Sequence, residues 1–167
     1  MYAVGDYVVY GIHGVCRILD LQEQCAGTHR KMYYVLEPMD QSGAKYMLPS
    51  DNPIVLAKIR PVMTKEELEK ILHSSEVNKG CWVADENKRK QTYRELINGG
   101  DRVELIRMIG TLERHKQAQV LAGRKFHLCD ENFLKDAKKL IEGEISLVLG
   151  IEKQQVGTYI KQAIYGE

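Results

Sequence analysis

The side chains best suited to chemistry in this 167-residue chain are a tryptophan and the cations that follow it. Trp82 is the only tryptophan, and Lys88, Arg89 and Lys90 come six to eight residues later. A flat indole ring can replace a lost base stack, while cationic groups hold a phosphate backbone. These four residues are therefore our candidate DNA-binding residues. On composition alone, an indole that packs against the edge of a helical core is an equal alternative.

The charge is unevenly distributed along the chain. There are 24 basic and 23 acidic side chains, and this formal net charge of +1 excludes a polycation that binds nucleic acid through net charge alone. Residues 79–94 nevertheless hold five basic and two acidic side chains, and residues 102–125 hold six and two, whereas residues 1–63 hold six of each. Residues 130–167 hold five and seven. The basic middle could meet phosphates and release counterions, and an ordinary solvated surface is the alternative.

The elements that must position these residues change character near residue 60. Before that point, short β-branched and aromatic runs alternate with turn sequences, which predicts four or five antiparallel strands curled into a small SH3- or Tudor-like β-barrel. Pro49, Pro53 and Pro61 mark its exit, because proline removes a backbone donor and disfavours helix before it. The expected strands are 7–10, 15–21, 32–36 and 45–48.

After Pro61 the apolar residues recur with helical spacing. Thr64 opens a capping-box sequence, Asp101 opens a second helix start of the same type, and Gly99-Gly100 ends the helix before it. The expected helices are 64–72, 85–97, 101–112, 130–149 and 156–164. The fold class is thus predicted to be α+β with two domains, a small antiparallel β-barrel at 1–60 and an all-α helical domain at 61–167.

Catalytic motifs are not found in the sequence. Gly11 and Gly14 lie too close together for a dinucleotide loop, and neither a phosphate-binding G-x-x-x-x-G-K-[ST] nor a G-x-S-x-G motif occurs. Glu142 and Glu144 point to different sides of a helix and are expected to be solvated charges. We therefore expect a protein that is not an enzyme and uses no cofactor.

Metal binding and membrane insertion are not expected either. The four cysteines and five histidines lack the spacing of metal ligands, so we expect no metal site. Neither a membrane span nor a secretory signal is found, which predicts a cytoplasmic protein with no membrane partner.

The opening of the chain resembles a family of transcription regulators. The run Val4–Tyr10 (VGDYVVY), followed by His13-Gly14-Val15, is very similar to the start of the CarD/CdnL regulators. The same module resembles the RNA polymerase-interacting domain of the transcription-repair coupling factor, and Tyr33–Leu36 and Leu48-Pro49 fit it too. Further residues resemble the family's helical domain: Trp82, the basic cluster, Gly100-Asp101, the 105–114 region and the 137–149 region.

This resemblance implies a function with two partners. The N-terminal Tudor-like domain would dock on the RNA polymerase β subunit. The helical domain would touch promoter DNA at the upstream edge of the bubble, with a tryptophan as a minor-groove wedge that is not sequence-specific. Such a protein would stabilise the open promoter complex, and docking on polymerase would raise the local DNA concentration.

Two positions depart from the family pattern. Where well-known members contact polymerase with arginines, this chain has Met47 and, near the other position, Gln24. We expect Lys45, Tyr46 and Met47 to be the polymerase-binding residues, with backbone and apolar contacts. Trp82 also lies about one helical turn further from Gly100-Asp101 than in the common pattern.

A function of a different class also fits the residues. The β-barrel could be a protein-interaction module, with a helical docking or oligomerisation domain and no direct DNA role. An exposed sheet edge would permit strand pairing with a partner or dimerisation by exchange, so a monomer and a domain-swapped dimer both remain open.

Overall fold

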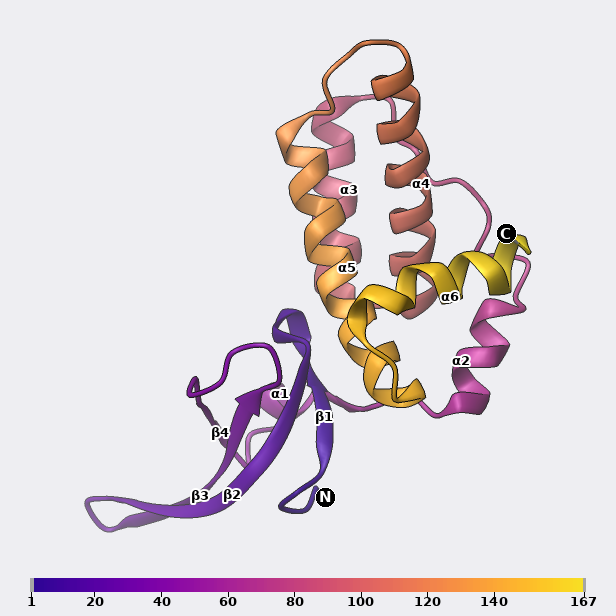
Figure 1. The fold of residues 1–167 in the computed structure, drawn as a ribbon. Helices are drawn as coiled ribbons and strands as arrows, with labels where there is room; N and C mark the ends of the chain where they lie inside the picture. The colour runs from indigo at the N-terminus through magenta and orange to yellow at the C-terminus, as the bar shows by residue number, and fades with distance from the viewer. Residues whose placement is uncertain (1, 167) are drawn as a thin grey trace. The chain divides into compact units, whose positions relative to one another are not determined.

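The chain contains a sheet and a group of helices, in that order (Figure 1). A computed structural model describes residues 2–166, and the chain divides into two compact units, Met1–Val62 and Met63–Glu167. The predicted α+β class, an antiparallel sheet followed by helices, is confirmed.

The first unit is built on a five-stranded antiparallel sheet with the order β4-β3-β2-β1-β5. The hairpin of β2 and β3 is longer than the sequence predicts and extends beyond the other strands (Figure 1). Its outer part is exposed and mostly polar, so it lacks the apolar alternation that identifies a half-buried strand. The elements are β1 (Tyr7–Tyr10), η1 (Gly11–His13), β2 (Val15–Ala26), β3 (His29–Pro38), β4 (Tyr46–Pro49), α1 (Pro53–Leu56) and β5 (Ile59–Pro61).

The core of this unit lies on one face of the sheet. Ile18 pairs with Leu36, and Leu48 pairs with Tyr34, and all four side chains are buried in one cluster. The strand order leaves β4 at one edge and β5 at the other. Within residues 2–166, β4 pairs only with β3, so its second backbone edge is unpaired.

The second unit consists of helices that begin and end where the sequence provides caps. Thr64 and Glu67 form a complete capping box, and the Asp101 carboxylate accepts a hydrogen bond from the backbone N–H of Glu104. Gly100 ends α3 in the left-handed conformation, with φ +67°, which favours glycine. The helices are α2 (Lys65–Leu72), α3 (Glu86–Gly99), α4 (Arg102–Leu121), α5 (Leu128–Leu149) and α6 (Lys153–Tyr165).

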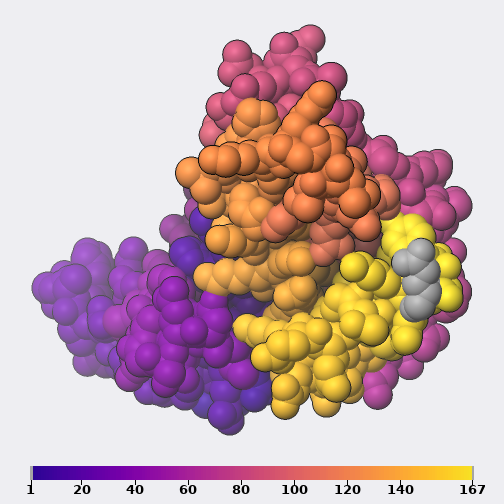
Figure 2. All heavy atoms as spheres, turned by 45° about the horizontal axis from the view of Figure 1, so that its top comes forward, coloured from indigo at the N-terminus to yellow at the C-terminus, as the bar shows by residue number. Residues whose placement is uncertain are grey.

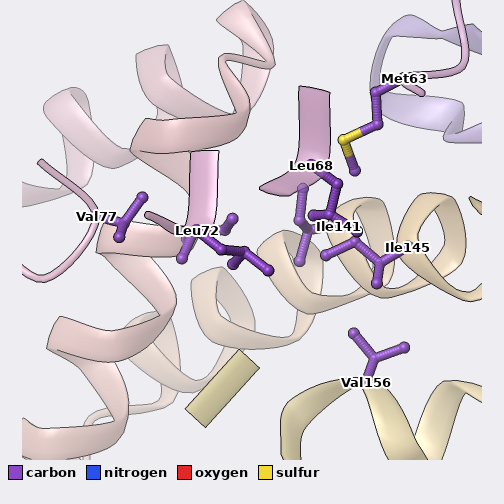
Figure 3. Packing of buried hydrophobic residues seen from close by; sticks show 8 residues of the cluster. Met63, Leu68, Leu72, Val77, Ile141, Ile145 and Val156 are labelled. Carbon is purple, nitrogen blue, oxygen red and sulfur yellow. The ribbon is translucent and has the colours of Figure 1, made fainter. Parts of the chain in front are cut away.

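Apolar side chains of the helices form two clusters. In one, α2, α5 and α6 converge, and Leu68, Leu72, Ile141, Ile145 and Val156 gather between them (Figure 3). The C-terminal α6 lies against α5, and the two are seen as neighbouring yellow and orange surfaces in Figure 2. In the other cluster, α3, α4 and α5 lie side by side (Figure 1). Its buried members include Tyr93, Leu105, Met108, Leu112, Leu134 and Ala137.

Glu144 differs from the expectation of a solvated charge. It is 1% exposed, and its carboxylate accepts hydrogen bonds from the Arg102 Nε at 3.0 Å and from the backbone N–H of Met63 at 2.9 Å. The prediction was wrong because Glu144 follows Ile141 by three residues and so lies on the apolar face of α5. Its neighbour Glu142 is half-buried, and burial raises the pKa of that carboxyl group. The Arg102–Glu144 pair therefore connects the start of α4 to α5.

Glu144→Ala should lower the free energy of unfolding in urea by about 3 kcal/mol, because it removes the buried carboxylate that binds Arg102. Glu69→Ala, at an exposed position on α2, is the matched control and should change stability by less than about 0.5 kcal/mol. Equal stabilities for the two variants would contradict this role of Glu144.

Candidate functional site

Trp82 lies in an irregular segment whose backbone is held by side chains of α3 and α4. The Tyr93 hydroxyl donates a hydrogen bond to the Cys81 carbonyl at 3.0 Å, and the Cys81 N–H donates to the Thr111 hydroxyl at 3.1 Å. From α4, the Arg107 Nε donates to the Lys79 carbonyl at 3.2 Å. Because these bonds come from two packed helices, the segment that carries Trp82 has a defined position.

The indole of Trp82 belongs to a small aromatic and cationic stack. It stacks on the imidazole of His115, with ring centres 3.6 Å apart and planes 18° from parallel. The guanidinium carbon of Arg89 lies 4.4 Å from the indole centre, and the Phe126 ring lies 6.2 Å from that of His115. Trp82 is still 37% exposed. The ring is thus supported by the helices and is still partly exposed to solvent.

Arg89 takes a different role from the expected phosphate contact. Its Nε and Nη2 donate to the two Asp130 oxygens at 2.9 and 3.1 Å, and both side chains are almost fully buried. Its Nη1 donates to the Val83 carbonyl at 3.0 Å. The guanidinium is therefore occupied inside the protein, where it ties α3 to the start of α5 and holds the segment beside Trp82.

The three consecutive cations separate because successive residues on a helix point about 100° apart. Arg89 faces inward, whereas the Lys90 ammonium pairs with Glu86 at 2.9 Å. That hydrogen bond raises the pKa of Lys90 and lowers the pKa of Glu86. Lys88 is exposed, and no ion pair is found for it among the described residues. Of the cluster, Lys88 is the cation best placed for an external anion.

The predicted polymerase-binding residues lie on both faces of the edge strand β4. Met47 is 41% exposed, and the Gln24 amide donates a hydrogen bond to its sulfur at 3.6 Å. Lys45, just before β4, is also exposed. Tyr46 points to the opposite face, where its ring lies 4.5 Å from that of His13. Met47, at one position where the resemblance expects an arginine, is therefore in contact across the sheet with Gln24, which lies at or next to the other.

Sequence reasoning missed three residues that complete the arrangement around these positions. Asp130 and His115 fix Arg89 and Trp82, and the ring of His13 lies beside that of Tyr46 at a tilt of 41°. Each comes from a segment distant in sequence from its partner, so spacing alone gave no signal for any of them.

One hollow in the described part of the chain is lined mainly by polar and charged side chains. Its volume is about 340 Å³, and its charged side chains come from α4, α5 and α6, among them Glu113, Lys138 and Lys153. Pockets for drug-sized ligands are mainly apolar instead. Among residues 2–166, no group of three His, Cys, Asp or Glu side chains is arranged to hold a metal ion. None of the described helices has the length and apolar character needed to cross a membrane.

The stack makes a prediction about His115. Burial lowers its pKa below the ordinary 6.5; the negative charge of Asp130 opposes this shift, and the positive charges of Arg89 and His127 add to it. As the pH falls, the unfolded chain therefore protonates the His115 ring at a higher pH than the folded protein does. The neutral ring of His115 contributes fully to the stability of the fold above pH 6.5, and this contribution is lost as the pH falls towards the folded pKa.

An NMR titration of the His115 ring should give a midpoint below 6.5. Trp82 fluorescence should change over the same pH range, and His115→Gln should abolish that change. A His115 midpoint at or above 6.5 would contradict the stacked, partly desolvated geometry.

Comparisons with known proteins agree with the resemblance of the opening motif. Residues 2–63 match the family model described as the CarD-like/TRCF RID domain. The chain is also 24% identical over 159 residues to a Bacillus subtilis (strain 168) protein named "Putative transcription factor YdeB", which covers 95% of this chain and 99% of that protein. The matched residues contain the sheet and the strand β4 described above. The N-terminal unit of this chain therefore belongs to the CarD-like/TRCF RID domain family.

Proposed function

We propose that the chain is a non-enzymatic transcription regulator that works on RNA polymerase in the cytoplasm. Its N-terminal unit docks on the polymerase β subunit, and its helical unit contacts promoter DNA near the upstream edge of the bubble. The two contacts together stabilise the open complex. The single observation that carries the proposal is an exposed, firmly supported Trp82 in a chain whose first unit belongs to the CarD-like/TRCF RID domain family.

Docking is assigned to the edge of the sheet at β4. This strand pairs with β3 alone among the described residues, so its outer backbone groups can accept a strand of the partner. Beside that edge lie the exposed Met47 and Lys45, with Gln24 in contact with Met47. Met and Gln in place of arginines favour a docking contact made by apolar and backbone groups.

DNA contact is assigned to Trp82, with Lys88 as an exposed cation of α3 for which no ion pair is found among residues 2–166. The indole is held by His115 and Arg89, so little side-chain entropy is lost when it meets a base step. A stacking ring and a lysine on a phosphate discriminate little between bases, which suits a contact that is not sequence-specific. Polymerase docking supplies a high effective DNA concentration, so weak binding by the helical unit is enough.

Met47→Asp should weaken binding to purified RNA polymerase or its isolated β lobe at least tenfold, because it places a charge in an apolar contact. Met39→Asp is the matched control, since Met39 is also an exposed methionine on the same unit (51%, against 41% for Met47) but lies outside β4. Binding is measured by pulldown and titration. Docking through β4 would be contradicted if both variants lost binding equally, or if neither lost any.

Trp82→Ala should shorten the lifetime of open promoter complexes about tenfold while leaving polymerase binding unchanged, because removal of a stacking ring costs about 1–3 kcal/mol. Trp82→Phe should retain part of the effect. Tyr165→Ala removes another exposed aromatic ring of the helical unit and serves as the control.

If Trp82→Ala left the lifetime of open promoter complexes unchanged while polymerase binding stayed intact, Trp82 would not act as a wedge. If polymerase binding were also undetectable, the chain would instead fit an interaction module without a DNA role.

A further inference from the structure

The turn between α4 and α5 exposes large apolar side chains that the functions above leave unused. Leu121, at the end of α4, is 81% exposed, and Leu128, at the start of α5, is 74% exposed. Val120 beside them is 63% exposed. Three large apolar residues so close in sequence and so open to water are typical of a surface that another molecule covers.

The backbone of the turn is ordered. The N–H of Arg124 donates to the Gln119 carbonyl at 2.8 Å, and the N–H of Gly123 donates to the Val120 carbonyl at 3.0 Å. This pair of bonds is the Schellman arrangement, and Gly123 supplies its left-handed residue with φ +71°. The apolar residues are therefore displayed by a fixed helix end.

The charge of the turn identifies the kind of partner. Residues 114–129 contain no Asp or Glu, and within them Arg124 and Lys125 are exposed. No ion pair involving these two side chains is found in residues 2–166. A surface that is both apolar and cationic is complementary to an anionic partner that also offers an apolar face.

The turn is continuous with the Trp82 site. Phe126, in the turn, is the ring that lies 6.2 Å from His115, and His115 stacks on Trp82. The Arg89–Asp130 pair brings the start of α3 to the start of α5, at the end of the helices where the turn lies (Figure 1). A partner that covers Trp82 can thus extend over the turn.

We propose that the α4–α5 turn is a second contact for duplex DNA. Leu121 and Leu128 pack against the sugars and base edges of the minor groove, and Arg124 and Lys125 bind the flanking phosphates. The inference rests on the proposed function, because it extends the DNA contact assigned to Trp82.

The test is an NMR titration of the full isotope-labelled chain with a short duplex, carried to millimolar DNA so that weak binding is detected. The amides of the turn should shift together with those around Trp82. Arg124→Gln with Lys125→Gln should lower the slope of log K against log salt by about 1.8, because each lost phosphate contact removes about 0.9. Lys65→Gln with Lys70→Gln removes two exposed lysines of α2 and should leave the slope unchanged.

Leu121→Ser with Leu128→Ser should weaken binding about fivefold or more without changing the salt slope, because only apolar burial is lost. Ile54→Ser is the control, since Ile54 is also 74% exposed but lies in the first unit. Thermal midpoints equal to the parent's show that each variant is folded.

Two outcomes would overturn the second contact: turn amides that do not shift with DNA, or a cation variant with the parent's salt slope.

Trp82→Ala in the same titration separates the two proposals. If it weakens binding while the turn variants do not, the proposed function stands and the turn inference fails. If the turn variants alone weaken binding, the second contact stands and the wedge fails. Leucine-dependent binding to phosphatidylglycerol vesicles, without shifts on DNA, would assign the turn to a membrane and overturn the inference.

Discussion

A buried ion pair, Arg89 with Asp130, is the interaction on which the arrangement of the helical unit's candidate site depends. Two charges removed from water are stable only when their hydrogen-bonding capacity is filled, and here both carboxylate oxygens and the guanidinium nitrogens have partners. The same guanidinium joins α3 to α5, donates a hydrogen bond to the Val83 carbonyl and lies against the indole of Trp82. Loss of either partner would therefore alter packing and the position of the tryptophan together.

This construction suits a protein whose DNA contact is local. The net charge is close to zero, and several of the basic residues in the middle of the chain are already paired within the protein. Under the proposed function, such a surface binds nucleic acid only weakly by itself, and the place of binding is set by the partner on which the sheet docks. The support of Trp82 by His115 and Arg89 is the helical unit's contribution, because a ring that is already ordered loses little entropy on contact.

Local signals in the sequence were sufficient for the fold class and for several helix boundaries. Thr64, Asp101 and Gly100 act as caps as predicted, because capping depends only on neighbouring residues. The role of Arg89 could not be predicted from such local signals. In sequence it is one of three similar cations, but its partner Asp130 lies 41 residues away, and only the packed helices bring the two together.

The burial of Glu144 could have been predicted from the sequence, because its spacing of three residues from Ile141 places it on the buried face of α5. For Lys45, Tyr46 and Met47, strand alternation predicts that neighbours face opposite sides, and the contact between Met47 and Gln24 needed the sheet register. The outer part of the β2–β3 hairpin lacks apolar alternation, so no local pattern indicated its length.

The most direct measurement of the central claim is photo-cross-linking from position 82. A photoreactive phenylalanine analogue would replace Trp82, and the protein would be irradiated in complexes of RNA polymerase with promoter DNA. The account predicts cross-links to the DNA at the upstream edge of the bubble, and their loss when Met47→Asp prevents docking. Cross-links that fall only on protein, in complexes where polymerase binding is intact, would contradict it.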